Sequence, residues 1–248
     1  MRIAFVLALA AALVAGNVQA QDGVTITGAV VDSDGKPAAG VEVANFWIGK
    51  RDFFGFGKGV TMTSYQGVKT DQDGKFSISV PAWMPEPALL AISADRKLGA
   101  LATVKPKESN VVPPMTLSPL VKVTGRFDCK ELGRKPPWTN VYVTTEKRAR
   151  LLQSDSSSAE FAFLLPAGKY RFNGYGTDVK GIDKDLEVPA DKSELDLGVI
   201  DLPATMIAKH VGKEPPAWTV TDARGLPKTV TLADLKGKWV LIEFWGFW

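Results

Sequence analysis

Short runs in which apolar and polar residues alternate follow one another along most of the chain. Residues 24–31 read V-T-I-T-G-A-V-V, and residues 40–44 and 76–81 continue the alternation. Turn residues separate these runs, as in the D-Q-D-G sequence at 71–74. Short strands divided by Gly, Pro and Asp turns are typical of a β-sandwich or a barrel. Because no helical spacing of apolar residues is sustained in these runs, we expect little helix here.

The same order of runs occurs twice, which indicates an internal duplication. Four landmarks of the first half recur in the second: residues 26–32 at 123–128, 40–43 at 140–143, 76–81 at 161–166, and 115–117 at 200–202. The first two landmarks recur after 97 and 100 positions, and the last two recur after 85 positions. The first copy therefore holds about 15 extra residues, in the stretch 47–67. We therefore predict two tandem sandwiches with a boundary near Ser118 and Pro119.

Aromatic residues are concentrated in this extra stretch, where Trp47, Phe53, Phe54, Phe56 and Tyr65 lie among glycines. One interpretation is a long hairpin whose rings fold back on their own sheet. The other is an exposed lip that binds sugar or peptide through its rings. The pattern favours the hairpin.

The first copy resembles the carboxypeptidase regulatory-like family of immunoglobulin-like sandwiches over residues 22–118. The resemblance depends on T-G-A-V-V-D at 27–32, on G-V-E-V at 40–43 and on T-D-Q-D-G-K-F at 70–76. The second copy departs from it, because it lacks the last of these stretches. The resemblance implies accessory binding or spacing modules and no catalysis.

The first twenty residues have the pattern of a secretory signal peptide. Arg2 is their only charge, residues 3–15 are apolar, and Val18-Gln19-Ala20 supplies small residues two apart. The apolar run is shorter than the roughly 20 residues that span a bilayer. We expect cleavage after Ala20, no membrane span after cleavage, and an exported protein in the periplasm or outside the cell.

Composition and charge argue against several classes of protein and of site. A net charge of +3 with 45% hydrophobic residues argues against a disordered chain and against a nucleic-acid binder. Cys129 is the single cysteine and His210 the single histidine, which excludes an internal disulfide and a zinc site. The D-x-D-G stretches at 32–35 and 71–74 lack the later ligands of a calcium loop. We expect neither a metal nor a cofactor.

The last forty residues have a different pattern. Residues 218–222 alternate like a strand, residues 232–238 read as one helical turn ended by Gly237, and residues 239–245 form an almost continuous apolar run. Such a run suits a central strand that is covered on both faces.

Residues 211–248 resemble the N-terminal quarter of a thioredoxin-like domain, of the kind found in exported thiol–disulfide oxidoreductases and redoxins. In that family the central strand ends in aromatic residues ahead of a Cys-x-x-Cys motif. The resemblance places five residues beside the active site: Phe244, Trp245, Gly246, Phe247 and Trp248. The chain ends where the motif is expected, so we assign no catalytic, cofactor-binding or metal-binding residue within it.

The predicted fold is mostly β: two tandem Ig-like β-sandwich domains followed by an incomplete thioredoxin-like α/β domain. The expected plan is a signal peptide at 1–20, sandwiches at 21–118 and 119–204, and a linker with the truncated domain at 205–248. The main hypothesis is a fragment of an exported thiol–disulfide oxidoreductase, inactive by itself, whose complete chain acts on protein thiols and disulfides. The alternative is a non-catalytic extracellular binding or structural protein whose sandwiches contact an envelope or extracellular ligand.

Overall fold

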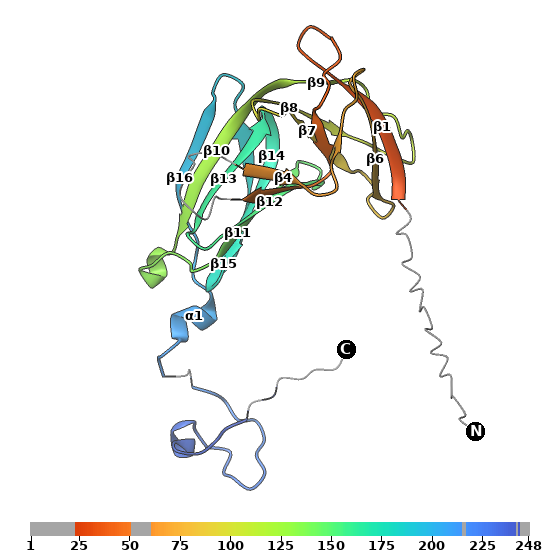
Figure 1. The fold of residues 1–248 in the computed structure, drawn as a ribbon. Coiled ribbons are helices and arrows are strands. Elements are labelled where there is room, and N and C mark those ends of the chain that lie inside the picture. The colour runs from red at the N-terminus through yellow and green to blue at the C-terminus, as the bar shows by residue number, and fades with distance from the viewer. Residues whose placement is uncertain (1–22, 51–60, 215–216, 242, 244–248) are drawn as a thin grey trace, which may run out of the picture.

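The computed structural model describes residues 23–50, 61–214, 217–241 and 243, and most of them form β-strands (Figure 1). The predicted signal peptide lies outside the described residues. So do three aromatic residues of the extra stretch, Phe53, Phe54 and Phe56. The mostly β fold that the sequence predicts is confirmed.

Strands of the first copy form two sheets. One sheet contains β6 (Lys75–Pro81), β1 (Gly23–Val31) and β9 (Met115–Thr116), with β1 antiparallel to β6 and parallel to β9. The other contains β5 (Val68–Lys69), β2 (Glu42–Ala44), β7 (Ala88–Ile92) and β8 (Leu98–Thr103), in that order and antiparallel.

Strands of the second copy pair in the same order. The long strand β10 (Ser118–Asp128) is antiparallel to β13 (Glu160–Pro166) and parallel to β16 (Glu194–Asp201). The facing sheet contains β12 (Arg150–Ser156), β11 (Thr139–Thr145), β14 (Gly168–Gly176) and β15 (Val179–Val188). The predicted internal repeat is therefore present in the strand pairing of both halves.

The repeat extends to single residue pairs. Gly28 lies opposite Phe76 in the first copy, and Gly125 lies opposite Phe161 in the second. A Cβ atom at Gly28 would come within 2.7 Å of the Phe76 ring, and one at Gly125 within 2.5 Å of the Phe161 ring. In both copies the ring therefore packs directly on the backbone of the facing strand, which requires glycine there.

The extra stretch of the first copy forms the predicted hairpin but joins a different sheet. Strand β3 (Trp47–Lys50) pairs with β4 (Thr61–Ser64), and β3 also runs parallel to β12 of the second copy, with Trp47 opposite Leu152. The strands of the hairpin thus join the sheet of the second copy, whereas the ring of Trp47 is fully buried and donates to the carbonyl oxygen of Leu90 on β7 of the first copy (3.0 Å). Strand β5 has only two residues, whereas β12 has seven and offers a longer free edge for pairing.

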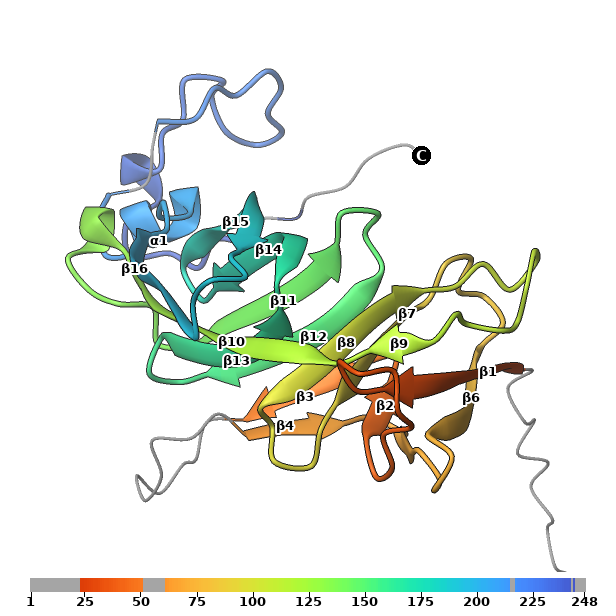
Figure 2. The ribbon, with the colours of Figure 1, turned by 90° about the horizontal axis from the view of Figure 1, so that it is seen from above.

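The two copies share a hydrophobic core. Strand β7 is buried along its whole length: Leu89 and Ala91 face the core of the first copy, while Leu90 and Ile92 face the larger core. The larger core joins these side chains and Trp47 to residues of the second copy. Strand β10 begins beside β8 and continues into the second copy (Figure 2), so the described sheets form one continuous body.

Beyond the sandwiches the chain forms little regular structure. Short helix α1 (Met206–His210) lies below the second copy in Figure 1, and a 3₁₀ turn, η1 (Lys130–Leu132), precedes β11. A second 3₁₀ turn, η2 (Ala233–Leu235), with Gly237 at a φ of 82°, confirms the predicted helical turn ended by glycine.

The strand expected at residues 218–222 is not formed, and no strand lies between residues 217 and 241 of the described chain. The side chain of Trp239 is fully exposed, and that of Leu241 nearly so. An isolated strand has no neighbour with which to form hydrogen bonds, so its apolar pattern alone does not order it.

Candidate functional site

The five residues that the sequence places beside an active site, Phe244, Trp245, Gly246, Phe247 and Trp248, lie outside the described residues. The segment before them is held by local contacts. The indole of Trp218 donates to the carbonyl oxygen of Val230 (3.1 Å). The Asp234 carboxylate accepts from the backbone N–H (2.8 Å) and the hydroxyl (2.7 Å) of Thr231, and these bonds lower the pKa of Asp234.

Cys129, the single cysteine, has no solvent-exposed surface and packs in the larger core. A thiol must reach the attacked sulfur, so a buried cysteine cannot exchange with a partner's disulfide. His210 ends α1 and is exposed, as the sequence predicts. Among the described residues, no group of three or more His, Cys, Asp or Glu side chains could hold a metal ion.

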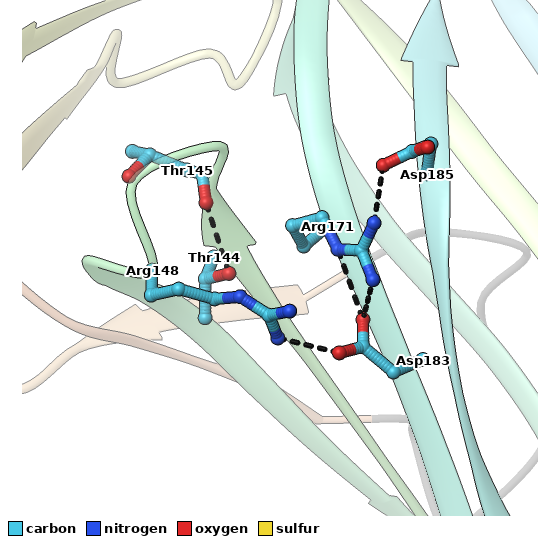
Figure 3. A network of polar contacts seen from close by, with 6 residues as sticks. All are labelled: Thr144, Thr145, Arg148, Arg171, Asp183 and Asp185. Atoms are coloured by element: carbon cyan, nitrogen blue, oxygen red, sulfur yellow. Dashed lines mark hydrogen bonds and ion pairs between the residues drawn. The ribbon is translucent and has the colours of Figure 1, made fainter.

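Charged side chains form a network on the second copy (Figure 3). Arg171 on β14 donates to Asp183 (2.6 Å from Nη2 and 3.0 Å from Nε) and to Asp185 (2.5 Å) on β15. Arg148, in the turn between β11 and β12, donates to the other carboxylate oxygen of Asp183 (2.5 Å). The network therefore connects the turn between β11 and β12 to strands β14 and β15.

Two cations and two anions balance in this network. The hydrogen bond from Arg148, together with that from Arg171, holds the pKa of Asp183 below its ordinary value, and Asp185 and Asp183 raise the pKa of Arg171. Asp183 and Asp185 both lie on strand β15. Carboxylates engaged in this way are charged and bonded, so the network stabilises the sheet and offers no free acid or base.

Three aromatic rings meet on the same sheet. Tyr175 lies 5.7 Å from Trp138 and 6.2 Å from Tyr142 between ring centroids, and both contacts are edge-on at 68°. Trp138 and Tyr175 each keep 39% of their surface exposed. These rings are not among the residues that the sequence predicts to be functional. A usable signal is that residues 140, 142 and 144 and residues 171, 173 and 175 are polar or aromatic at alternate positions, which indicates an outward face of two strands.

Two asparagines lie among the rings. Asn140 is 1% exposed and Asn173 is 5% exposed. The amide nitrogen of Asn140 donates to Asp155 on β12, but its Oδ1 atom and the Nδ2 atom of Asn173 have no hydrogen-bond partner in the described part of the chain. Buried polar atoms are normally paired, so these two are unusual.

No helix among the described residues is long and apolar enough to cross a membrane.

Comparison with curated proteins gives short sequence matches to a thiol-disulfide oxidoreductase. No protein-family model matches the chain, so the resemblance to the carboxypeptidase regulatory-like family stays a prediction. The thiol-disulfide oxidoreductase ResA of Bacillus anthracis is 53% identical over 39 residues, which is 16% of this chain and 21% of ResA. ResA of Bacillus cereus (strain ATCC 10987 / NRS 248) is 50% identical over the same length. The chain thus spans about a fifth of the length of these relatives.

Solved structures that are similar to this chain have low TM-scores and low sequence identity. The Bacillus anthracis TIE protein has a TM-score of 0.33 and 10% identity, covering 73% of this chain and 34% of its own. A streptococcal ancillary pilin has a TM-score of 0.32 and 10% identity, covering 74% and 63%. Likenesses this weak say nothing about function.

Proposed function

We propose that this chain carries the beginning of a thiol–disulfide oxidoreductase domain behind two exported β-sandwich modules. The observation that supports this most strongly is the 53% identity to ResA over 39 residues. That length is within one residue of the segment 211–248, which resembles a thioredoxin-like domain on independent sequence grounds.

The chemistry of such a domain needs groups that the described residues do not supply. A helix N-terminus lowers the pKa of a thiol, the thiolate attacks a disulfide sulfur, and a second cysteine resolves the mixed disulfide. Cys129 is buried and has no second cysteine to pair with. We propose that the 248-residue chain is inactive and that the redox cysteines belong to a longer reading frame, directly after Trp248.

In this proposal the sandwiches hold the redox domain at a fixed point. Glu131 anchors the start of the linker: its carboxylate accepts from the backbone N–H of Ala204 (2.7 Å) and pairs with Lys209 of α1 (2.7 Å). The backbone N–H of Thr205 donates to the carbonyl oxygen of Asp178 (2.8 Å). The chain is therefore attached to the second copy as far as α1, which suits a rigid spacer between an exported N-terminus and a redox domain.

An insulin reduction assay tests the proposal. We expect the native reading frame to continue into Cys-x-x-Cys, and the extended protein to reduce insulin in the presence of dithiothreitol. Replacing both motif cysteines by serine should abolish the activity, and the 248-residue chain should have none. Cys129→Ala in the extended protein is the matched control and should keep full activity, because Cys129 is buried in the sandwich core. A native transcript that terminates directly after codon 248 would contradict the proposal.

The alternative is a non-catalytic binding protein outside the cytoplasm. The exposed rings of Trp138 and Tyr175 on an otherwise polar sheet favour a binding role for the second copy. The two functions are compatible, since a redox domain can be carried by a module that binds a ligand.

A further inference from the structure

Five residues of the second copy form a surface that we call the aromatic–amide face: Trp138, Asn140, Tyr142, Asn173 and Tyr175. On neighbouring strands β11 and β14, Asn140 lies opposite Tyr175 and Tyr142 lies opposite Asn173. Side chains that are directly opposite in a sheet project to the same side.

The aromatic–amide face is turned away from the core. Val141, Val143 and Phe172, at the alternate positions of the same two strands, are fully buried in the core on the other side. Trp138 stands at the entrance to β11, and its carbonyl oxygen accepts from the backbone N–H of Thr177 (3.0 Å). The ring is therefore presented from a fixed backbone.

The rings of the aromatic–amide face offer apolar contact in more than one plane. Trp138 and Tyr142 both meet Tyr175 at 68°, so the three rings cannot form a flat platform. Aromatic rings bind ligands that present apolar C–H surface, and tyrosine and tryptophan do so while keeping a polar group in water. A ligand that fits this arrangement is flexible or twisted.

The asparagines add unpaired polar groups directly beside the rings. Oδ1 of Asn140 is an acceptor without a donor, and Nδ2 of Asn173 is a donor without an acceptor, among the described residues. Both asparagines are more than nine-tenths buried, and each lies directly opposite a tyrosine of this face. A ligand group that both donates and accepts can satisfy both atoms once a ring turns aside, and a hydroxyl group is such a group.

The charge around this surface argues for a neutral ligand. Arg148 and Arg171 are engaged by Asp183 and Asp185 in the network described above, which leaves no net charge there for an ionic partner. Asp155, at the rim, accepts from Asn140. The charged groups beside this face are thus already paired or hydrogen-bonded to one another, which leaves little for an ionic ligand to bind.

We infer that the aromatic–amide face binds a neutral oligosaccharide. A pyranose ring presents apolar C–H faces to aromatic rings and carries hydroxyls that both donate and accept. The tilted rings suit a soluble, twisted chain of sugars better than a flat crystalline surface. This inference is independent of the proposed redox function and assigns a ligand class to the second sandwich.

The test is isothermal titration calorimetry of the 248-residue chain with three neutral probes: cellohexaose, maltohexaose and hexa-N-acetylchitohexaose. We expect at least one to bind, and Trp138→Ala and Tyr175→Ala each to weaken that binding at least tenfold. Trp83→Ala removes an exposed tryptophan of the first copy and is the matched control, with unchanged binding. Thermal unfolding of each variant checks the fold, and Trp138→Phe should restore part of the binding.

Three outcomes would overturn the inference. The first is that none of the three probes binds at millimolar concentration. The second is that Trp138→Ala binds as tightly as the wild type while remaining folded. The third is that sedimentation reveals a dimer that Trp138→Ala dissociates, because the face would then be an interface between two copies of this chain.

Discussion

The two copies of the duplicated sandwich share a strand order but differ in what covers their equivalent strands. In the first copy, β7 reads A-L-L-A-I and is buried on both faces, between its own core and the core shared with the second copy. In the second copy the equivalent strand is β14, which buries Tyr170 and Phe172 on one side and carries Arg171 and Tyr175 on the other. The same strand position is thus buried on both faces in the first copy, whereas in the second copy it keeps one outward face that is available for binding.

Trp47→Ala should have the largest effect on this arrangement. The substitution removes a fully buried indole from the shared core, together with its hydrogen bond to the carbonyl oxygen of Leu90 (3.0 Å). Truncations of this kind lower the free energy of unfolding by about 3–5 kcal/mol. Because both copies contribute to that core, guanidinium denaturation should show a single transition in the wild type, shifted to lower denaturant in the variant.

The control for this experiment is Trp83→Ala, which removes an exposed tryptophan and should change the free energy of unfolding by less than about 0.5 kcal/mol. Two separate transitions in the wild-type protein would show that the copies unfold independently, and the shared core would then not couple them.

Gly74→Ala and Ala159→Gly should have unequal effects although the two positions are equivalent. Each residue has a positive φ, 73° and 62°, and each carbonyl oxygen accepts a 2.8 Å hydrogen bond, from the N–H of Val30 and of Phe127. A Cβ at Gly74 would lie 2.5 Å from the carbonyl oxygen of Val30. Gly74→Ala should therefore lower the free energy of unfolding by about 1–3 kcal/mol.

Ala159→Gly removes the backbone strain of a non-glycine residue at positive φ, but it also increases the conformational entropy of the unfolded chain. Because these effects oppose each other, the free energy of unfolding should change by less than about 1 kcal/mol. Urea denaturation of both variants measures the contrast. Equal losses at the two positions would mean that the turn at Gly74 accommodates a Cβ atom, against its close approach to the carbonyl oxygen of Val30.

Asp183→Asn should have the smallest effect, confined to the outward face of the second copy. The folded-state pKa of Asp183 lies below its ordinary value of 3.8, because the carboxylate bonds to Arg148 and Arg171. Its stabilising contribution is therefore present above the unfolded pKa and is lost as the pH falls through the folded pKa. The urea midpoints of wild type and variant should differ at neutral pH and converge in acid, and salt should reduce the difference. A difference that grows in acid would contradict this assignment.

The sequence predicts the strands and the duplication well because both depend on local alternation and on turns. Residues 24–31 and 76–81 alternate and lie in β1 and β6, and the matched runs of the second copy follow the same pairing. The partner of the hairpin β3–β4 could not be predicted in this way. Its pairing with β12 depends on which strand edge is free in the folded protein, and neighbouring residues carry no signal for that.

The candidate surface was missed for a similar reason. Trp138 and Tyr175 are 37 positions apart, and only the register of β11 with β14 brings their rings together. For the apolar run at the C-terminus the local pattern misleads. The pattern suits a central strand, but a strand forms only beside hydrogen-bonded neighbours. The expectation about residues 244–248 stays a prediction, since they lie outside the described residues.

The crossing of β3 and β4 into the other copy has a practical consequence for anyone who dissects this protein. Severing the polypeptide at residue 118 would strip β12 of its outer neighbour and take away the indole that fills the larger core. The excised second half would expose unpaired backbone amides of β12 together with apolar core side chains. Exposed strand edges of this kind promote aggregation through strand pairing. Supplying residues 23–117 as a separate piece should rescue it, in the manner of a split protein reassembled from halves.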